Sequence, residues 1–313
     1  MKFFNKNFHL LLLFSFFSFF VFSSFSIYSQ DKSLNKKQGE FKPSFVFSSS
    51  YLFSNSVYGE NVYSSLLFLS GKVKQSAISN KISFDHITNN SNALLKTFNS
   101  FSNASILENG SNMYMLFLSS SYASSEDFSH ALKYSFAYQH NTKLSETSSY
   151  DFMLLVTRLN GYSKKYKNVP FPIPLLMYNY KSNPWALRIG LPFYLVYKQS
   201  NYSYGVTYMP IASLNIFAKY TFFKFIMLEF FATSKADHIV SKKFEDDDEL
   251  YIYNCCAGIK FGAYFSRNVS ANISSFYNFY TADWVGDSFW GYYDKHRTLK
   301  KSLSFRFELM AMF

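Results

Sequence analysis

Apolar and polar side chains alternate along the last stretch of the chain, residues 301–313. Every second residue, counted back from the end, is apolar: Phe313, Ala311, Leu309, Phe307, Phe305 and Leu303. The residues between them include Ser302, Ser304, Arg306 and Glu308. Because successive side chains of a β-strand point to opposite faces, this pattern predicts a strand with one apolar face. Strands of soluble domains are typically about five or six residues long, so the length favours a longer type of strand.

The same alternation returns in several internal segments, most clearly in residues 128–139, 185–198, 251–265 and 269–279. Their apolar faces are rich in aromatic residues, and the opposite faces carry mainly small or polar ones. Most runs after residue 128 reach the length of about 9–11 residues that a tilted membrane-spanning strand requires. We predict about 12 strands, with about 10 or 14 as alternatives, because single-chain bacterial barrels favour even numbers.

The terminal strand ending in Phe313 resembles that of the outer-membrane β-barrel proteins of Gram-negative bacteria. In these proteins a final strand that ends in Phe serves as the assembly signal. The resemblance implies an all-β, antiparallel up-and-down transmembrane barrel in the outer membrane. It also implies that the barrel-assembly machinery, outer-membrane lipid and lipopolysaccharide are partners. The implied signal residues are Leu303, Phe305, Phe307, Leu309 and Phe313.

A second resemblance covers about the last 130 residues, from residues 186–193 through Tyr208-Met-Pro210 to the terminal Phe. These short motifs are similar to an uncharacterised family of outer-membrane barrels. That family has no assigned activity, so it implies the fold and no catalytic residues.

Several segments interrupt the alternation. Residues 88–110 are rich in Asn and Ser, which predicts a long loop at the outer end of a barrel. Residues 169–174 hold three prolines, and because proline has no N–H to donate, we expect a loop or an inserted segment there. Pro192 and Pro210 are predicted to lie at a bulge or a strand end, with Pro192 within or beside a bulge.

The composition supports a barrel over a helical membrane protein. Aromatic residues make up 22% of the chain, with 39 Phe and 26 Tyr, yet only 48% of all residues are hydrophobic. Mean hydropathy is −0.08, whereas a bundle of membrane helices would need long apolar runs. Lipid-facing and lumen-facing residues alternate in a membrane barrel, so their contributions cancel along the chain.

The N-terminal residues form a separate unit. Lys2 and Lys6 precede an apolar core at residues 10–22, and small polar residues follow. This order predicts a secretory signal peptide over residues 1–30, with a transmembrane anchor as the alternative. Residues 31–43 are polar and basic and are expected to form a periplasmic lead-in, which leaves residues 44–313 for the barrel.

Little in the sequence indicates catalysis or a cofactor. The net charge of +11 becomes +9 without residues 1–30, and the basic residues are scattered, which argues against nucleic-acid binding. The six His residues form neither a G-x-S-x-G nor an H-E-x-x-H motif, so we predict no enzyme, metal or cofactor. Cys255 and Cys256 are adjacent and cannot readily form a disulfide. The acidic run at residues 246–249 leaves a divalent cation that bridges lipopolysaccharide as an open alternative.

The polar faces indicate what the barrel could conduct. If the aromatic faces point to lipid, the inward charges are Lys133, Arg188, Lys198, Lys260, Arg306 and Glu308. An excess of positive charge in a narrow lumen attracts anions. We therefore expect a passive or semi-selective channel for small solutes, preferentially anionic. The alternative is a closed barrel with a structural, adhesive or surface-interaction role.

Overall fold

The computed structural model describes residues 44–73, 76–89, 92–123, 132–158, 170–210, 213–223, 225–241, 244, 248–266, 268–286 and 296–313. The expected signal peptide and the lead-in, residues 1–43, lie outside these ranges. The described part of the chain contains no helix with the length and apolar character to cross a membrane. It consists almost entirely of β-strands.

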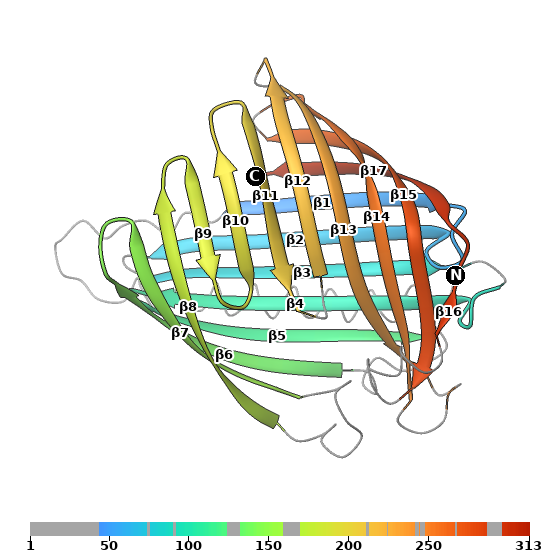
Figure 1. Cartoon of the computed structure of the whole chain (residues 1–313), viewed down its shortest axis with the longest axis horizontal. Helices are drawn as coiled ribbons and strands as arrows, with labels where there is room; N and C mark the ends of the chain where they lie inside the picture. Colours follow the sequence, from blue (N-terminus) through green and yellow to red (C-terminus); the bar gives the residue numbers. More distant parts are fainter. Residues whose placement is uncertain are drawn as a thin grey trace, which may run out of the picture.

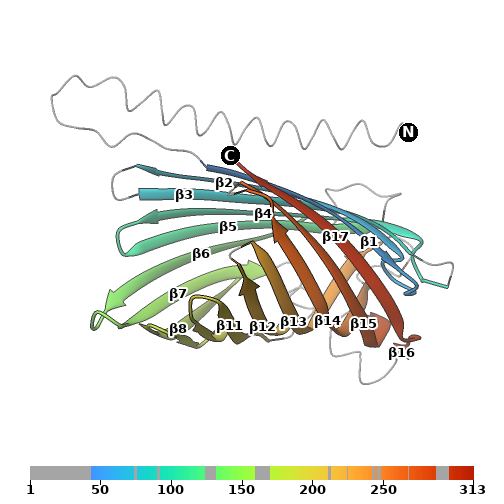
Figure 2. The same cartoon turned by 90° about the horizontal axis from the view of Figure 1, so that it is seen from above.

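The strands in chain order are β1 (Ser44–Ser54), β2 (Asn61–Val73), β3 (Ser76–Thr88), β4 (Thr97–Asn109), β5 (Asn112–Ala123), β6 (Leu132–Lys143), β7 (Ser148–Arg158), β8 (Pro170–Ser182), β9 (Trp185–Ile189), β10 (Phe193–Lys198), β11 (Tyr202–Met209), β12 (Ser213–Phe222), β13 (Ile226–Val240), β14 (Glu249–Tyr264), β15 (Val269–Gly286), β16 (Arg297–Thr298) and β17 (Ser302–Met312). Consecutive strands from β1 to β16 pair antiparallel, β15 also pairs with β17, and β17 pairs with β1, so the sheet closes into a barrel (Figures 1 and 2). The predicted fold class is confirmed.

The predicted number of strands is wrong. The short β16 pairs only with the outer part of β15, and β17 pairs with the remainder of β15. The barrel wall is therefore a ring of sixteen strands. Residues 185–198 form two strands, β9 and β10, although their apolar positions suggested one. Gly190 and Pro192 lie in the turn between them, so the expected bulge at Pro192 is wrong. Pro210 directly follows the end of β11, in agreement with the prediction of a strand end.

The expected outer loop at residues 88–110 is also wrong, because most of it is β4. Asn and Ser side chains here bond one another across strands. The Asn80 amide donates to Ser105 Oγ at 2.7 Å, and the Asn103 amide donates to Asn80 Oδ1 at 3.2 Å. Cross-strand polar pairs stabilise a sheet, so a composition typical of loops is compatible with a strand.

The two ends of the barrel differ. One end of the barrel is where the start of β1 lies beside the end of β17. Tight turns at this end connect β4 to β5, β6 to β7, β8 to β9, and β10 to β11. At that end Phe313 N donates to Phe45 O at 2.7 Å, and Phe45 N donates to Phe313 O at 2.9 Å. The connections after β3, β5, β7, β13 and β15 at the other end are longer. Outer-membrane barrels have short periplasmic turns and long outer loops, so we call these the turn end and the outer end.

The wall of the barrel is uneven in height. Strands β9, β10, β11 and β12 have 5, 6, 8 and 10 residues, whereas β13, β14 and β15 have 15, 16 and 18. Figure 1 shows these four short strands beside the long β13–β15. We call β9–β12 the low wall.

The segment with three prolines is part of β8, so the expected loop at residues 169–174 is wrong from Pro170 onward. Pro170, Pro172 and Pro174 stand opposite Arg158, Val156 and Leu154 of β7. The spacing explains why a strand tolerates them. Alternate residues of a strand turn their N–H groups to the same side, so all three prolines lack a donor on one edge only.

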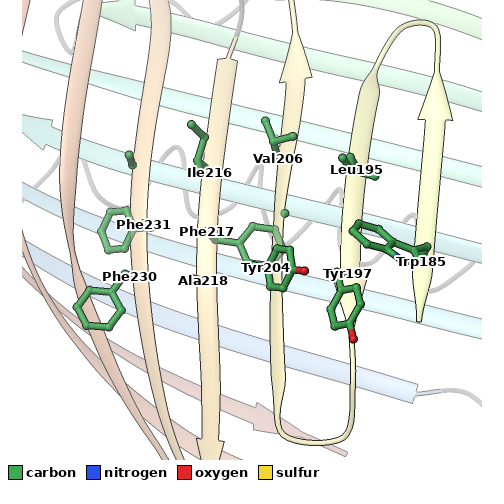
Figure 3. Close-up of a pocket in the computed structure, with 12 residues that line it drawn as sticks. Trp185, Leu195, Tyr197, Tyr204, Val206, Ile216, Phe217, Ala218, Phe230 and Phe231 are labelled. Carbon is green, nitrogen blue, oxygen red and sulfur yellow. The ribbon is translucent and has the colours of Figure 1, made fainter. Parts of the chain in front are cut away.

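The outer surface of the barrel is apolar over most strands. Phe47, Phe136, Phe152, Ile216, Phe230, Phe261, Ile273 and Phe305 are among the large apolar side chains exposed on it. A depression of about 610 Å³ lies on the low wall and the neighbouring part of β13. Figure 3 shows the side chains of Trp185, Leu195, Tyr204 and Ile216 around it. Such a surface is stable in contact with lipid and would aggregate in water.

Gly190 is required at the turn between β9 and β10. Its φ is +132°, and a Cβ placed there would lie 2.6 Å from Met177 Cγ. We expect Gly190→Ala to destabilise the barrel by about 1–3 kcal/mol, which urea unfolding in liposomes would measure. Gly110→Ala is the matched control because Gly110 also has positive φ, +60°, with nothing within 4 Å of the added Cβ. Equal stability of the two variants would contradict the close packing at Gly190.

Candidate functional site

A line of charged residues crosses the inner face of the wall from β10 to β17. The strand register places Lys198 opposite Ser203, Ser203 opposite Lys219, Lys219 opposite Glu229 and Glu229 opposite Lys260. Lys260 stands opposite Ser274, and Ser274 opposite Arg306. We call Lys198, Lys219, Glu229, Lys260 and Arg306 the charged row. Four of its five charges are positive.

The charged row borders a cavity inside the barrel of about 490 Å³. Its basic lining residues are Lys235, Lys260 and Arg306, and its acidic ones are Asp85, Glu229, Asp237 and Glu308. Serine, threonine and asparagine side chains make up much of the remaining surface. A cavity with this lining is suited to water and polar solutes.

Glu308 is held in place on the inner face beside the charged row. Ser48 Oγ donates to Glu308 Oε1 at 3.2 Å, and the Asn272 amide donates to Glu308 Oε2 at 3.1 Å. Lys260 Nζ lies 3.9 Å from the same carboxylate. The Arg306 guanidinium lies 5.8 Å from the centre of the Phe276 ring, a cation–π distance. These partners hold the Glu308 and Arg306 side chains against the wall.

Of the six lumen charges expected from the sequence, the structure brings Lys260, Arg306 and Glu308 together in the cavity. Lys198 lies in the charged row, where it lines a hollow with Lys219 near the turn end. Lys133 and Arg188 instead form ion pairs with buried acids. Lys133 Nζ lies 3.1 Å from Glu249 Oε2, and Arg188 Nη2 lies 3.2 Å from Asp151 Oδ2.

Sequence reasoning missed Lys219, although the period of two would have placed it inward between Ala218 and Tyr220. It could not have found the two buried acids. Asp151 lies in a segment of weak alternation, and Glu249 follows a charged loop. Their partners are distant in sequence, 37 residues for Asp151 and 116 for Glu249.

An apolar cluster fills the outer end of the barrel. Its buried members are Tyr58, Leu95, Phe98, Ala123, Ile239, Leu250 and Ile252, and we call them the apolar plug. They come from strands and connections on both sides of the barrel, β1–β5 and β13–β14. Val240 of β13 pairs with Tyr122 of β5, although these strands lie far apart around the ring. The outer ends of the two walls are therefore drawn together over the cavity.

A polar triad fastens the plug to the wall. The Tyr58 hydroxyl donates to Asp283 Oδ2 at 2.7 Å, and Arg297 donates through Nε and Nη2 to the two carboxylate oxygens at 2.9 and 2.5 Å. Asp283 is only 1% exposed. Burial and the Asp283 carboxylate raise the pKa of the Tyr58 hydroxyl well above its usual value, so it remains a donor. The hydrogen bond to Asp283 raises the pKa of Arg297. We call Tyr58, Asp283 and Arg297 the latch.

The described residues contain no group of three or more His, Cys, Asp or Glu side chains arranged to hold a metal ion. Cys255 and Cys256 are free thiols on β14, and the register with β15 shifts between them. Asp246 and Asp247 of the acidic run lie outside the described residues. Glu249 of the same run is bonded to Lys133.

No family model matches the chain, and no curated protein matches it either. Among solved structures it is similar to Pseudomonas aeruginosa OpdQ, with 7% identity, a TM-score of 0.40 and coverage of 88% of this chain and 99% of that chain. It is also similar to Acinetobacter baumannii OccAB4, with 8% identity, a TM-score of 0.39 and coverage of 88% and 99%. For the KdgM porin the identity is 7%, the TM-score is 0.30 and the coverage is 86% and 99%. Likeness at this level carries no argument about activity, and the barrel fold rests on this chain's own strand pairing.

Proposed function

We propose that this chain is an outer-membrane channel that conducts small solutes and favours anions. An outer-membrane location is supported by the closed barrel, its apolar outer surface and its short-turn and long-loop ends. The polar cavity of about 490 Å³ provides space for solutes of low mass. Lipopolysaccharide and membrane lipid would surround the barrel.

The charged row is the observation that supports a preference for anions. Lys198, Lys219, Lys260 and Arg306 outnumber Glu229 across one wall. The cavity's other acids weigh against it, yet two of them have basic partners. Lys235 Nζ lies 2.8 Å from Asp237 Oδ1, and Lys260, which belongs to the row, lies 3.9 Å from Glu308. Asp85 and Glu308 therefore reduce the excess of positive charge but do not reverse it. An anion that follows the charged row therefore meets a net positive surface.

Removal of positive charge from the row tests the preference. We expect Lys260→Gln combined with Arg306→Gln to shift the reversal potential of the refolded protein in a salt gradient toward cations. Lys301→Gln/Lys300→Gln removes the same charge from an exposed segment outside the row and should leave the potential nearly unchanged. A cation preference in the unmodified protein would overturn the proposal of anion selectivity.

The apolar plug favours a second candidate function. A barrel that remained closed at its outer end would have a structural, adhesive or surface-interaction role. Planar-bilayer recordings distinguish the two candidates. A closed barrel predicts no conductance from the unmodified protein or from variants in which the latch is broken.

We further propose that Phe313 and the outward residues of β17 form the assembly signal read by the barrel-assembly machinery. Leu303, Phe305, Phe307 and Leu309 are exposed on the outer face, and the Phe313 side chain is 77% exposed. The backbone of Phe313 is hydrogen-bonded to that of Phe45, which joins β17 to β1. The phenyl side chain of Phe313 makes few contacts within the protein.

Phe313→Ala separates recognition from packing because it keeps the backbone hydrogen bonds. We expect this variant to refold in detergent micelles like the unmodified chain, but to accumulate in cells as unfolded periplasmic protein. Phe279→Ala, also at an exposed outward position, is the control and should assemble normally. Normal assembly of Phe313→Ala in cells would contradict the signal, and poor refolding in micelles would assign the ring a packing role.

A further inference from the structure

The barrel wall is interrupted between β8 and β13, beyond the outer ends of the low wall. The pairing of β8 with β9 covers only Tyr178–Ser182, so residues 170–177 of β8 extend past it. On the other side, β12 pairs with β13 only up to Lys235, and β13 continues to Val240. At the outer tip Val240 pairs with Tyr122 of β5, but among the described residues no strand pairs with residues 236–239 of β13 or 170–177 of β8 on the sides that face one another. Figure 1 shows β8 and β13 separating beyond the short strands.

The interruption lies at the depth of the membrane. A strand rises about 3.3 Å per residue, so β9, with 5 residues, reaches only about half the length of the 9–11 residues that span the hydrocarbon core. β10, with 6 residues, reaches little further. Since these strands start at tight turns at the periplasmic end, the opening beside β8 faces the outer half of the bilayer, and it narrows toward β13 because β12, with 10 residues, spans the core.

The free edge of β8 is adapted to remain without a partner strand. Lys181 N donates to Thr147 O on the β7 side, so by the period of two the odd-numbered residues of β8 turn their N–H groups toward β7. The even-numbered residues turn theirs to the free edge, and Pro170, Pro172 and Pro174 have none to present. Unsatisfied backbone groups are strongly unfavourable in hydrocarbon, and the prolines remove three of the four N–H groups from this edge, leaving the N–H of Leu176 and the carbonyl oxygens. It also prevents the edge from templating another strand.

The inner face of the wall beside the opening is apolar as well. The register with β7 places Phe171, Ile173 and Leu175 on the same face as Leu155 and Met153. Met177 and Asn179 continue this face toward Arg188, which places it on the inside of the barrel. Phe171 is 51% exposed, and Leu176 on the outer face is 68% exposed. Both faces of β8 at the opening therefore suit hydrocarbon, whereas the inner faces of β14, β15 and β17 beside the cavity are mostly polar, with Lys260, Asn278 and Arg306 among their residues.

We propose that the barrel is open laterally to the bilayer between β8 and β13, and that an acyl chain of a membrane lipid enters there and lies on the inner face of β7 and β8. Lipid is the occupant because the opening is continuous with the apolar outer surface of the low wall, which lipid already covers. The lumen then has a side route for apolar or amphiphilic molecules in addition to the axial path. This route is independent of ion conduction and of the charged row.

Spin labels on single cysteines test the proposal in phosphatidylcholine vesicles with the full chain. The background carries Cys255→Ser and Cys256→Ser, and the labelled sites are Ile173→Cys on the inner face of β8 and Leu155→Cys on β7. Leu176→Cys is the lipid-exposed reference, and Ser64→Cys in the cavity is the aqueous reference. The measurement is the ratio of collisions with oxygen, which concentrates in hydrocarbon, to collisions with a water-soluble nickel chelate.

We expect the labels at 173 and 155 to give a ratio close to that at 176 and well above that at 64. A ratio like that at 64 would show a water-filled wall and overturn the proposal. Protection from both reagents would show that protein covers the inner face, which also overturns it. Two labelled sites on different strands keep the result independent of one variant that fails to refold.

Discussion

Arg297→Met is expected to increase the frequency of channel openings by about two orders of magnitude. The substitution removes the two hydrogen bonds that Arg297 donates to the buried Asp283 carboxylate and leaves only the one from the Tyr58 hydroxyl. Loss of one partner from a buried ion pair costs about 3–5 kcal/mol, and the lower figure applies because Arg297 is itself 46% exposed. We expect channel openings when the apolar plug moves out of its place at the outer end. Raising the free energy of the form with the plug in place by about 3 kcal/mol increases the ratio of displaced to in-place forms by about a hundredfold.

Single-channel recording in planar bilayers measures this effect. Lys300→Met removes an exposed charge three residues away and should leave the openings unchanged. The double variant Arg297→Met/Asp283→Asn should return toward the original frequency, because the neutral amide no longer leaves a buried charge without its counterion. Unchanged openings in Arg297→Met would contradict the view that the latch holds the plug in the conduction path. Silence in every variant would favour the closed-barrel function.

The part of the fold that could be predicted is the part with strict alternation. The C-terminal strand and residues 251–279 have one aromatic face and one polar face, and they form β17, β14 and β15. The strand count failed where this signal is ambiguous. Apolar positions continue in phase from β9 through Gly190 and Pro192 into β10, so the turn left no break in the pattern. In β4 the polar residues bond across strands, which composition alone cannot distinguish from a loop.

The candidate site divides in the same way. Lys260, Arg306 and Glu308 were found because a charge in a clear register must face inward when the other face meets lipid. Asp151, Glu249 and the latch were not found, because each depends on contacts between segments far apart in sequence. Tyr58 and Asp283 are 225 residues apart, and both lie near strand ends, where alternation gives no guidance. The apolar plug has the same origin, since it forms only when opposite walls meet.

Replacing Pro170, Pro172 and Pro174 together by valine is expected to join two barrels in a dimer paired along the free edge of β8. Valine is a good strand former, so the pairing with β7 should persist, while three N–H groups appear on the free edge of β8. Each would lie unsatisfied in hydrocarbon at a cost of several kcal/mol. Two such edges from different barrels can satisfy one another by pairing antiparallel.

Chemical crosslinking in vesicles, followed by electrophoresis without heating, would detect the dimer as the dominant species. Pro210→Val is the control because Pro210 follows the end of β11 and borders no free edge of this kind, so this variant should form no dimer beyond that of the unmodified chain. A triple variant that forms no new dimer and is as stable as the unmodified chain would mean that the edge already has a partner within the protein. A triple variant that forms no new dimer but unfolds more readily would still indicate an exposed edge, since the added donors then remain unpaired. The three prolines therefore bear directly on whether the wall between β8 and β13 is open.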